Sequence, residues 1–221
     1  MRHLLVLRPE PGASATVDRA RALGLEAVAI PLFEVEPVNW EAPEAAAFDG
    51  LLLTSANAVR CCGEGLRSLR GLKVYAVGEA TADAAREAGF DVAATGEAGV
   101  DRLLGSIEPD LKLLHLCGSE RYEPSRATQG ITRVTVYRAT PVEAPDLSAA
   151  PGSVALIHSP RAGRRFAELV ADRHAISIAA ISPAAADAVG EGWWTVETAV
   201  RPNDDALLAL AERLCDKPDP K

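Results

Sequence analysis

The chain has 221 residues, of which 48% are apolar and 24% charged, and its formal net charge at pH 7 is −8. This composition is that of an ordinary globular protein with one large or two small domains. No apolar run approaches the ~20 residues of a membrane span, and the N-terminal apolar segment is too short for a signal peptide. An acidic chain without a basic stripe disfavours nucleic acid as a partner. We therefore expect a soluble, cytoplasmic protein that binds neither nucleic acid nor membrane.

Cysteine and histidine give no sign of a metal centre. The four cysteines, which include the adjacent pair Cys61 and Cys62, form neither a C-x-x-C motif nor a disulfide framework. The four histidines do not have the spacing of metal ligands. We predict reduced cysteines and no metal.

Short apolar strands alternate with helices along most of the chain. The expected strands are 4–7, 27–30, 51–53, 73–77, 91–94, 111–116, 154–157, 176–181 and 194–198. The expected helices are 14–23, 43–47, one from residue 58, 78–88, 100–107, 124–129, 159–173, 182–190 and 204–214, followed by a frayed tail at 216–221. This alternation predicts an α/β fold of the flavodoxin or Rossmann kind, with parallel sheets covered on both faces.

The segment Arg133–Pro141 differs from these strands because polar residues alternate with Val134 and Val136. A period of two places Thr135 and Tyr137 together on the opposite face. The simpler interpretation of Tyr137 is an amphipathic tyrosine on a sheet edge, with its ring buried and its hydroxyl in water. A functional phenol is the alternative.

The two halves of the sequence match at a constant offset. Ser55 and Ser159 are 104 residues apart, as are Pro37 and Pro141, so we interpret the chain as an internal duplication. Phe33 then pairs with Tyr137.

The duplication predicts two flavodoxin-like lobes with a cleft between them. The segments 33–39 and 133–142 are expected to form a two-stranded ladder that joins the lobes. One lobe is then discontinuous, 1–32 plus 143–221, and the other is 40–132. It follows that strand 4–7 lies in the sheet of strand 154–157, and strand 111–116 in the sheet of strand 51–53.

Four polar junctions follow predicted strands: Thr54-Ser55, Gly78 to Thr81, His158-Ser159 and Ser182-Pro183. In a parallel sheet they lie at the carboxyl ends of strands, where helix N-termini present N–H groups to ligands. Helix capping is the simpler explanation for any one of them. Four such junctions on two lobes also fit a binding site.

Five stretches are specific as an ordered set: LLLTSANAV (51–59), VYAVGEATADAAREAGF (74–90), VTVYRATP (134–141), ALIHSPRA (155–162) and IAAISPAAADAV (178–189). Together they resemble the uroporphyrinogen-III synthase family. The resemblance implies two α/β lobes on a two-stranded ladder and a cyclising hydro-lyase without a cofactor. The implied reaction turns hydroxymethylbilane, a linear tetrapyrrole, into uroporphyrinogen III by inverting the last ring through a spiro intermediate.

The resemblance also implies site residues. Tyr137 matches the family's tyrosine and is the implied general acid, since a phenol with a pKa of about 10 is protonated at pH 7. The implied substrate contacts are Ser55, Thr81 and Ser159, with Ser182, Arg8, Arg138 and Arg161 as further candidates. For each arginine a solvated surface charge is an equally good interpretation.

The resemblance departs from the family at two places and leaves one competing class of protein. The stretch 117–121, Cys-Gly-Ser-Glu-Arg, only loosely matches the family's Arg-Gly-Glu strand end. Ser182 and Ala185 stand where the family tends to have Gly and Thr. A non-catalytic, two-lobed binding protein for an anionic small molecule would share the fold. We expect a monomer, and a transient handover of the bilane from hydroxymethylbilane synthase is left open.

Overall fold

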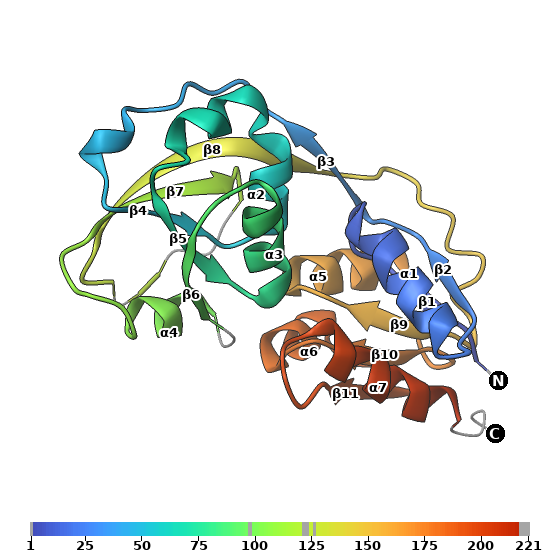
Figure 1. Cartoon of the computed structure of the whole chain (residues 1–221). Helices are drawn as coiled ribbons and strands as arrows, with labels where there is room; N and C mark the ends of the chain where they lie inside the picture. The colour runs from blue at the N-terminus through green and yellow to red at the C-terminus, as the bar shows by residue number, and fades with distance from the viewer. Residues whose placement is uncertain (1, 97–98, 121–123, 126, 217–221) are drawn as a thin grey trace. The chain divides into compact units, whose positions relative to one another are not determined.

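The computed structural model describes residues 2–96, 99–120, 124–125 and 127–216. The chain forms two compact units, an α/β arrangement with two mainly parallel sheets (Figure 1). Unit 1 comprises Met1–Glu34 and Pro141–Lys221, and unit 2 comprises Val35–Thr140.

Unit 1 contains a five-stranded sheet in the order β11-β10-β9-β1-β2. Its strands are β1 (Leu4–Val6), β2 (Ala27–Ala29), β9 (Val154–Ile157), β10 (Ser177–Ala180) and β11 (Thr195–Thr198). All neighbours are parallel, and Leu4 pairs with Val154. The predicted placement of the first strand beside strand 154–157 is confirmed.

Four helices cover this sheet: α1 (Gly12–Ala22), α5 (Pro160–Leu169), α6 (Pro183–Val189) and α7 (Asp204–Cys215). Leu4 and Val6 pack with α1 and α7 in one core cluster. Leu5 lies on the other face by alternation and is also fully buried, because α5 and α6 lie against β9 and β10. Both faces are covered, which explains why these strands are continuous apolar runs.

Unit 2 contains a six-stranded sheet in the order β3-β8-β7-β4-β5-β6. Its strands are β3 (Phe33–Pro37), β4 (Gly50–Leu53), β5 (Lys73–Val77), β6 (Val92–Gly96), β7 (Lys112–Gly118) and β8 (Gly130–Pro141). Strands β4 to β8 pair in parallel, and Leu53 lies opposite Leu116. The predicted neighbourhood of strands 51–53 and 111–116 is therefore confirmed.

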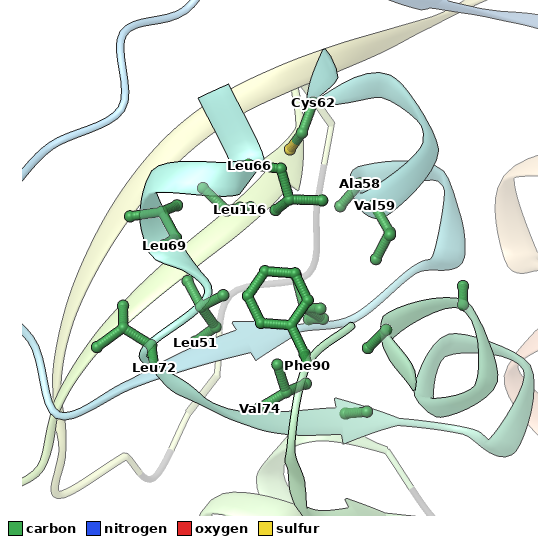
Figure 2. Close-up of a cluster of buried hydrophobic side chains, with 14 of the residues drawn as sticks. Leu51, Ala58, Val59, Cys62, Leu66, Leu69, Leu72, Val74, Phe90 and Leu116 are labelled. Carbon is green, nitrogen blue, oxygen red and sulfur yellow. The ribbon is translucent and has the colours of Figure 1, made fainter. Parts of the chain in front are cut away.

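Helices α2 (Ala56–Cys61) and α3 (Glu79–Glu87) pack on one face of this sheet, and α4 (Val100–Leu104) on the other. Short 3-10 turns occupy Ala45–Ala47 and Gly63–Leu69. Leu51 and Leu53 join the core on the α2 and α3 side, with Phe90 among them (Figure 2). Leu52 faces α4. Burying one such leucine contributes about 1.5–3 kcal/mol.

The edge strand β3 runs antiparallel to β8. The Val38 N–H donates to the Val136 carbonyl (3.1 Å), and the Val142 N–H donates to the Leu32 carbonyl (3.0 Å). Between these two hydrogen bonds the numbering rises from 136 to 142 on the β8 side and falls from 38 to 32 on the β3 side, as it does in an antiparallel pair. The two predicted connecting strands therefore lie side by side.

The segment before β8 differs from its prediction. A helix over 124–129 is wrong for the described residues 124–125 and 127–129, which are not helical. Gln129 instead donates its side-chain amide to the carbonyls of Leu104 and Glu108, so this segment is bound to the end of α4. The predicted frayed tail lies, from residue 217 on, outside the described residues. Of the helices in the described ranges, none is both long and apolar enough to cross a membrane.

Candidate active site

The carboxyl edge of the unit 2 sheet holds two of the predicted polar junctions and the end of β7. Ser55 follows β4 and caps α2, where its Oγ accepts a hydrogen bond from the Asn57 N–H (3.2 Å). Thr81 lies in the first turn of α3, after β5, and is buried. Gly118 ends β7. Because β7, β4 and β5 are adjacent and parallel, these residues lie along one edge of the sheet.

Tyr137 reaches the same edge through an irregularity in β8. Cys117 pairs with Thr135 but Gly118 pairs with Tyr137, so Val136 is an extra residue that forms a β-bulge. The Tyr137 ring is half-buried and packs against the cluster that contains Val136. The predicted alternation, with Tyr137 facing away from Val136, is wrong because the bulge breaks the period of two at this point.

The carboxyl edge of the unit 1 sheet carries the equivalent junctions. Ser159 follows β9 and caps α5, with its Oγ accepting from the Ala162 N–H (3.1 Å). Ser182 follows β10 and caps α6 through the Ala185 N–H (3.3 Å). Arg8 follows β1, the neighbour of β9. Both serines therefore cap helices, as the simpler interpretation of these junctions predicts. Both are also half-buried and lie at this edge of the sheet.

The three candidate arginines have different surroundings. The Arg161 guanidinium lies 4.2 Å from the centroid of the Phe33 ring, a cation–π contact. Arg138 forms an ion pair with Glu36 (2.8 Å) and its side chain is 62% exposed, which fits a solvated surface charge.

Ala185, where the family tends to have Thr, is fully buried.

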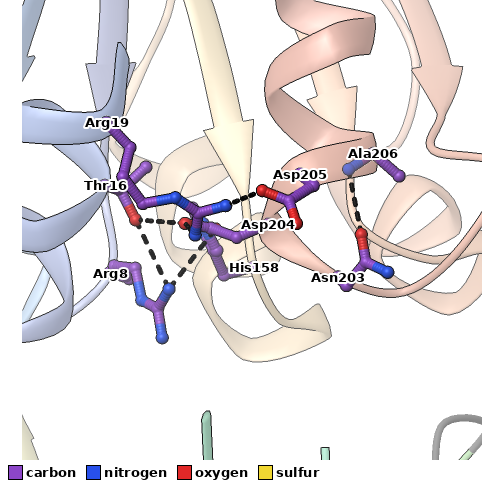
Figure 3. Close-up of polar contacts among 8 residues, drawn as sticks. All are labelled: Arg8, Thr16, Arg19, His158, Asn203, Asp204, Asp205 and Ala206. Atoms are coloured by element: carbon purple, nitrogen blue, oxygen red, sulfur yellow. Dashed lines mark hydrogen bonds and ion pairs between the residues drawn. The ribbon is translucent and has the colours of Figure 1, made fainter. Parts of the chain in front are cut away.

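Arg8 belongs to a partly buried polar network that no sequence pattern predicted (Figure 3). Asp204, in the first turn of α7, accepts hydrogen bonds from His158 Nε2 (2.9 Å) and Thr16 Oγ1 (2.9 Å). The guanidinium groups of Arg19 (2.9 Å) and Arg8 (3.4 Å) complete the set. The network joins the N-terminal segment of unit 1 to its C-terminal segment.

The network shifts the acidity of its members. Burial on its own raises the pKa of a carboxyl group. Hydrogen bonding from His158 and the charge of Arg8 outweigh burial and lower the pKa of Asp204 to about 2. Burial lowers the pKa of His158 by more than the Asp204 carboxylate raises it. At neutral pH the pair is a carboxylate that accepts the Nε2–H of an uncharged imidazole.

Comparisons with known proteins agree on one family. The family model for uroporphyrinogen-III synthase HemD matches residues 14–209. No curated protein sequence matches the chain significantly. Among solved structures, uroporphyrinogen-III synthetase of Helicobacter pylori 26695 is similar with a TM-score of 0.64 and 19% identity, covering 97% of this chain and 100% of that one.

A second solved structure has the same fold. A mutant uroporphyrinogen III synthase of the extremely thermophilic bacterium Thermus thermophilus has a TM-score of 0.55 and 17% identity, over 97% of this chain and 100% of that one. The family model spans most of the chain and includes Ser55, Thr81, Tyr137, Ser159 and Ser182. The chain belongs to the uroporphyrinogen-III synthase family.

Proposed function

We propose that the chain cyclises hydroxymethylbilane to uroporphyrinogen III and that Tyr137 is the general acid of this reaction. The phenol donates a proton to the terminal hydroxyl, which leaves as water. The remaining cation attacks the substituted carbon of the last ring, forms a spiro intermediate and rearranges with inversion of that ring. The observation that carries the assignment is the position of Tyr137 at the sheet edge that also holds Ser55 and Thr81.

Positioning decides the product in this proposal. Free bilane closes without inversion, so the protein has to hold the cation over the substituted carbon. The substrate is a polyanion and the chain has a net charge of −8, so attraction has to come from local donors. The positive N-terminal end of α5, with Ser159 as its cap and Arg161 in its first turn, is suited to this, and so is Arg8 nearby on the same edge.

Several finer features belong to the same proposal. We place the enzyme among the cyclising lyases and propose that it acts as a monomer in the cytoplasm. We also propose that the bilane binds between the two lobes, whose bounds are those predicted from the sequence. A duplication is supported by the strand orders, since β2-β1-β9-β10-β11 in unit 1 corresponds to β8-β7-β4-β5-β6 in unit 2. A two-lobed binding protein without activity is the alternative, and no observation favours it.

The experiment that tests the function is an isomer analysis. The purified chain is incubated with bilane generated enzymatically, and the products are oxidised and separated by chromatography. The proposal predicts type III porphyrin in large excess, at a rate proportional to protein concentration. Type I alone, at the rate of the reaction without protein, would favour the binding protein.

A negative charge introduced at position 159 distinguishes a role of Ser159 in helix capping from a role in substrate binding. Asp caps a helix about as well as Ser, so Ser159→Asp should keep the melting temperature. The added negative charge repels a carboxylate-rich substrate, so KM should rise about tenfold, which corresponds to ~1.4 kcal/mol. Ala171→Asp adds the same charge at an exposed position between α5 and β10 and should leave KM unchanged. An unchanged KM in Ser159→Asp would restrict Ser159 to capping.

A further inference from the structure

We infer that Gly118 is a positioning residue that holds the Tyr137 phenol in place by having no side chain. This inference rests on the proposed role of Tyr137. Gly118 is the last residue of β7 and pairs with Tyr137 across the β-bulge of β8. The two residues therefore sit opposite each other at the carboxyl edge of the sheet.

The phenol occupies the space in which a side chain at position 118 would lie. A Cβ atom built on Gly118 would be 2.7 Å from Cζ of Tyr137, 2.8 Å from Cε2 and 3.0 Å from the hydroxyl oxygen. Ordinary contacts of a Cβ atom begin near 3.4 Å. The end of the ring that carries the acid is thus the part in contact with the glycine.

Backbone conformation does not account for a glycine at this position. The described glycines with positive φ are 24, 63, 78, 89, 99, 152, 190 and 192, and Gly118 is not one of them. A residue with a side chain can adopt its backbone angles. A side chain is excluded at position 118 because the Tyr137 ring occupies the space that it would need.

The backbone of Tyr137 is fixed independently of this contact. The Ser119 N–H donates to the Tyr137 carbonyl (2.9 Å), and the neighbouring Val136 is fully buried. The ring cannot retreat by sliding the strand, so a methyl group at position 118 has to turn the side chain. Restoring an ordinary contact displaces Cζ by about 0.7 Å, the difference between 3.4 and 2.7 Å.

A displacement of this size is large for a proton donor. Misplacing a catalytic group by about 1 Å can cost about 10²-fold in rate. Gly118→Ala should therefore lower kcat for type III formation by about 10- to 100-fold with little change in KM. Gly130→Ala is the matched control at the other end of the β7–β8 pair, where an added Cβ meets nothing nearer than 4.0 Å. It should retain the wild-type rate.

Combining Gly118→Ala with Tyr137→Phe shows whether the glycine acts through the hydroxyl. Phenylalanine keeps the ring, so the steric conflict and any loss in melting temperature remain. The acid is already absent, so the double variant should be no slower than Tyr137→Phe alone. Multiplying rate losses would overturn the inference, because Gly118 would then serve the fold or the substrate directly.

Two further outcomes separate the inference from the function on which it rests. Wild-type turnover in Gly118→Ala, with Tyr137→Phe slow, overturns the positioning role and leaves the acid standing. Wild-type turnover in Tyr137→Phe overturns both. Stability gives a test that needs no activity: Gly118→Ala should lower the melting temperature in the wild type but not in Tyr137→Ala, where the ring is gone. An equal loss in both backgrounds contradicts the contact.

Discussion

Replacing Tyr137 with phenylalanine is expected to slow type III formation by about 10²-fold while the chain stays folded. General acid assistance is typically worth about 10²–10⁴-fold. We expect the low end because a hydroxyl on the methylene of an electron-rich pyrrole departs readily. The ring of Tyr137 packs on the core cluster of unit 2 and is retained in the variant, so the melting temperature should hardly change.

The isomer ratio adds a second readout for Tyr137→Phe. The rest of the site still orients the bilane, so the residual product should remain enriched in type III over the spontaneous type I. Tyr75→Phe is the matched control, because Tyr75 is a half-buried tyrosine of the same sheet that packs on the α4 side. Its turnover should equal that of the wild type. Full activity of Tyr137→Phe, with its fold verified by circular dichroism, would return Tyr137 to the interpretation of an edge-strand aromatic.

Asp204→Asn is expected to destabilise the chain by about 2–3 kcal/mol at pH 7 in urea unfolding. This figure follows from the lowering of the pKa of Asp204 from 3.8 to about 2, at ~1.4 kcal/mol for each pKa unit. The Asp204 side chain is only 14% exposed, so solvent screens it little. Asp205→Asn, one residue along the same helix and 86% exposed, should cost less than about 0.5 kcal/mol.

The effect of Asp204→Asn should depend on pH in a defined direction. Folding lowers the pKa of Asp204, so the carboxylate's contribution is complete above pH 3.8 and is lost as the pH falls to about 2. The wild type and the variant should therefore converge in stability at the acid end of this range. In the wild type the lowered pKa of His158 also reduces stability as the pH falls below 6.5, because the unfolded chain takes up that proton first. A constant difference between pH 2 and pH 5 would contradict this account.

Much of the fold follows from local sequence patterns. Leu51, Leu52 and Leu53 are all buried because helices cover both faces of the sheet, and the continuous apolar run predicts this. Ser159-Pro160 and Ser182-Pro183 begin helices in which the serine caps and the proline takes the first position. These signals lie within a few residues of one another.

The features that escaped prediction depend on contacts between distant residues. The bulge at Val136 arises from the register between β8 and β7, which no pattern inside the strand encodes. His158 and Asp204 are 46 residues apart; His158 alone looked like an ordinary junction residue, and Asp204 like an ordinary acidic start of a helix. A histidine directly after a buried strand and an acidic pair opening the last helix were visible signals, but nothing in the sequence joined them.

The most direct test of Tyr137 as general acid varies the leaving group. A bilane with a terminal acyloxymethyl group loses a carboxylate that needs no proton, whereas the hydroxymethyl substrate needs one. The measurement is the ratio of wild-type to Tyr137→Phe rates of type III formation for the two substrates, each corrected for spontaneous closure. We predict a ratio of about 10² for the hydroxymethyl substrate and a ratio near one for the acyloxymethyl substrate. An equal, large ratio for both substrates would contradict proton donation by Tyr137.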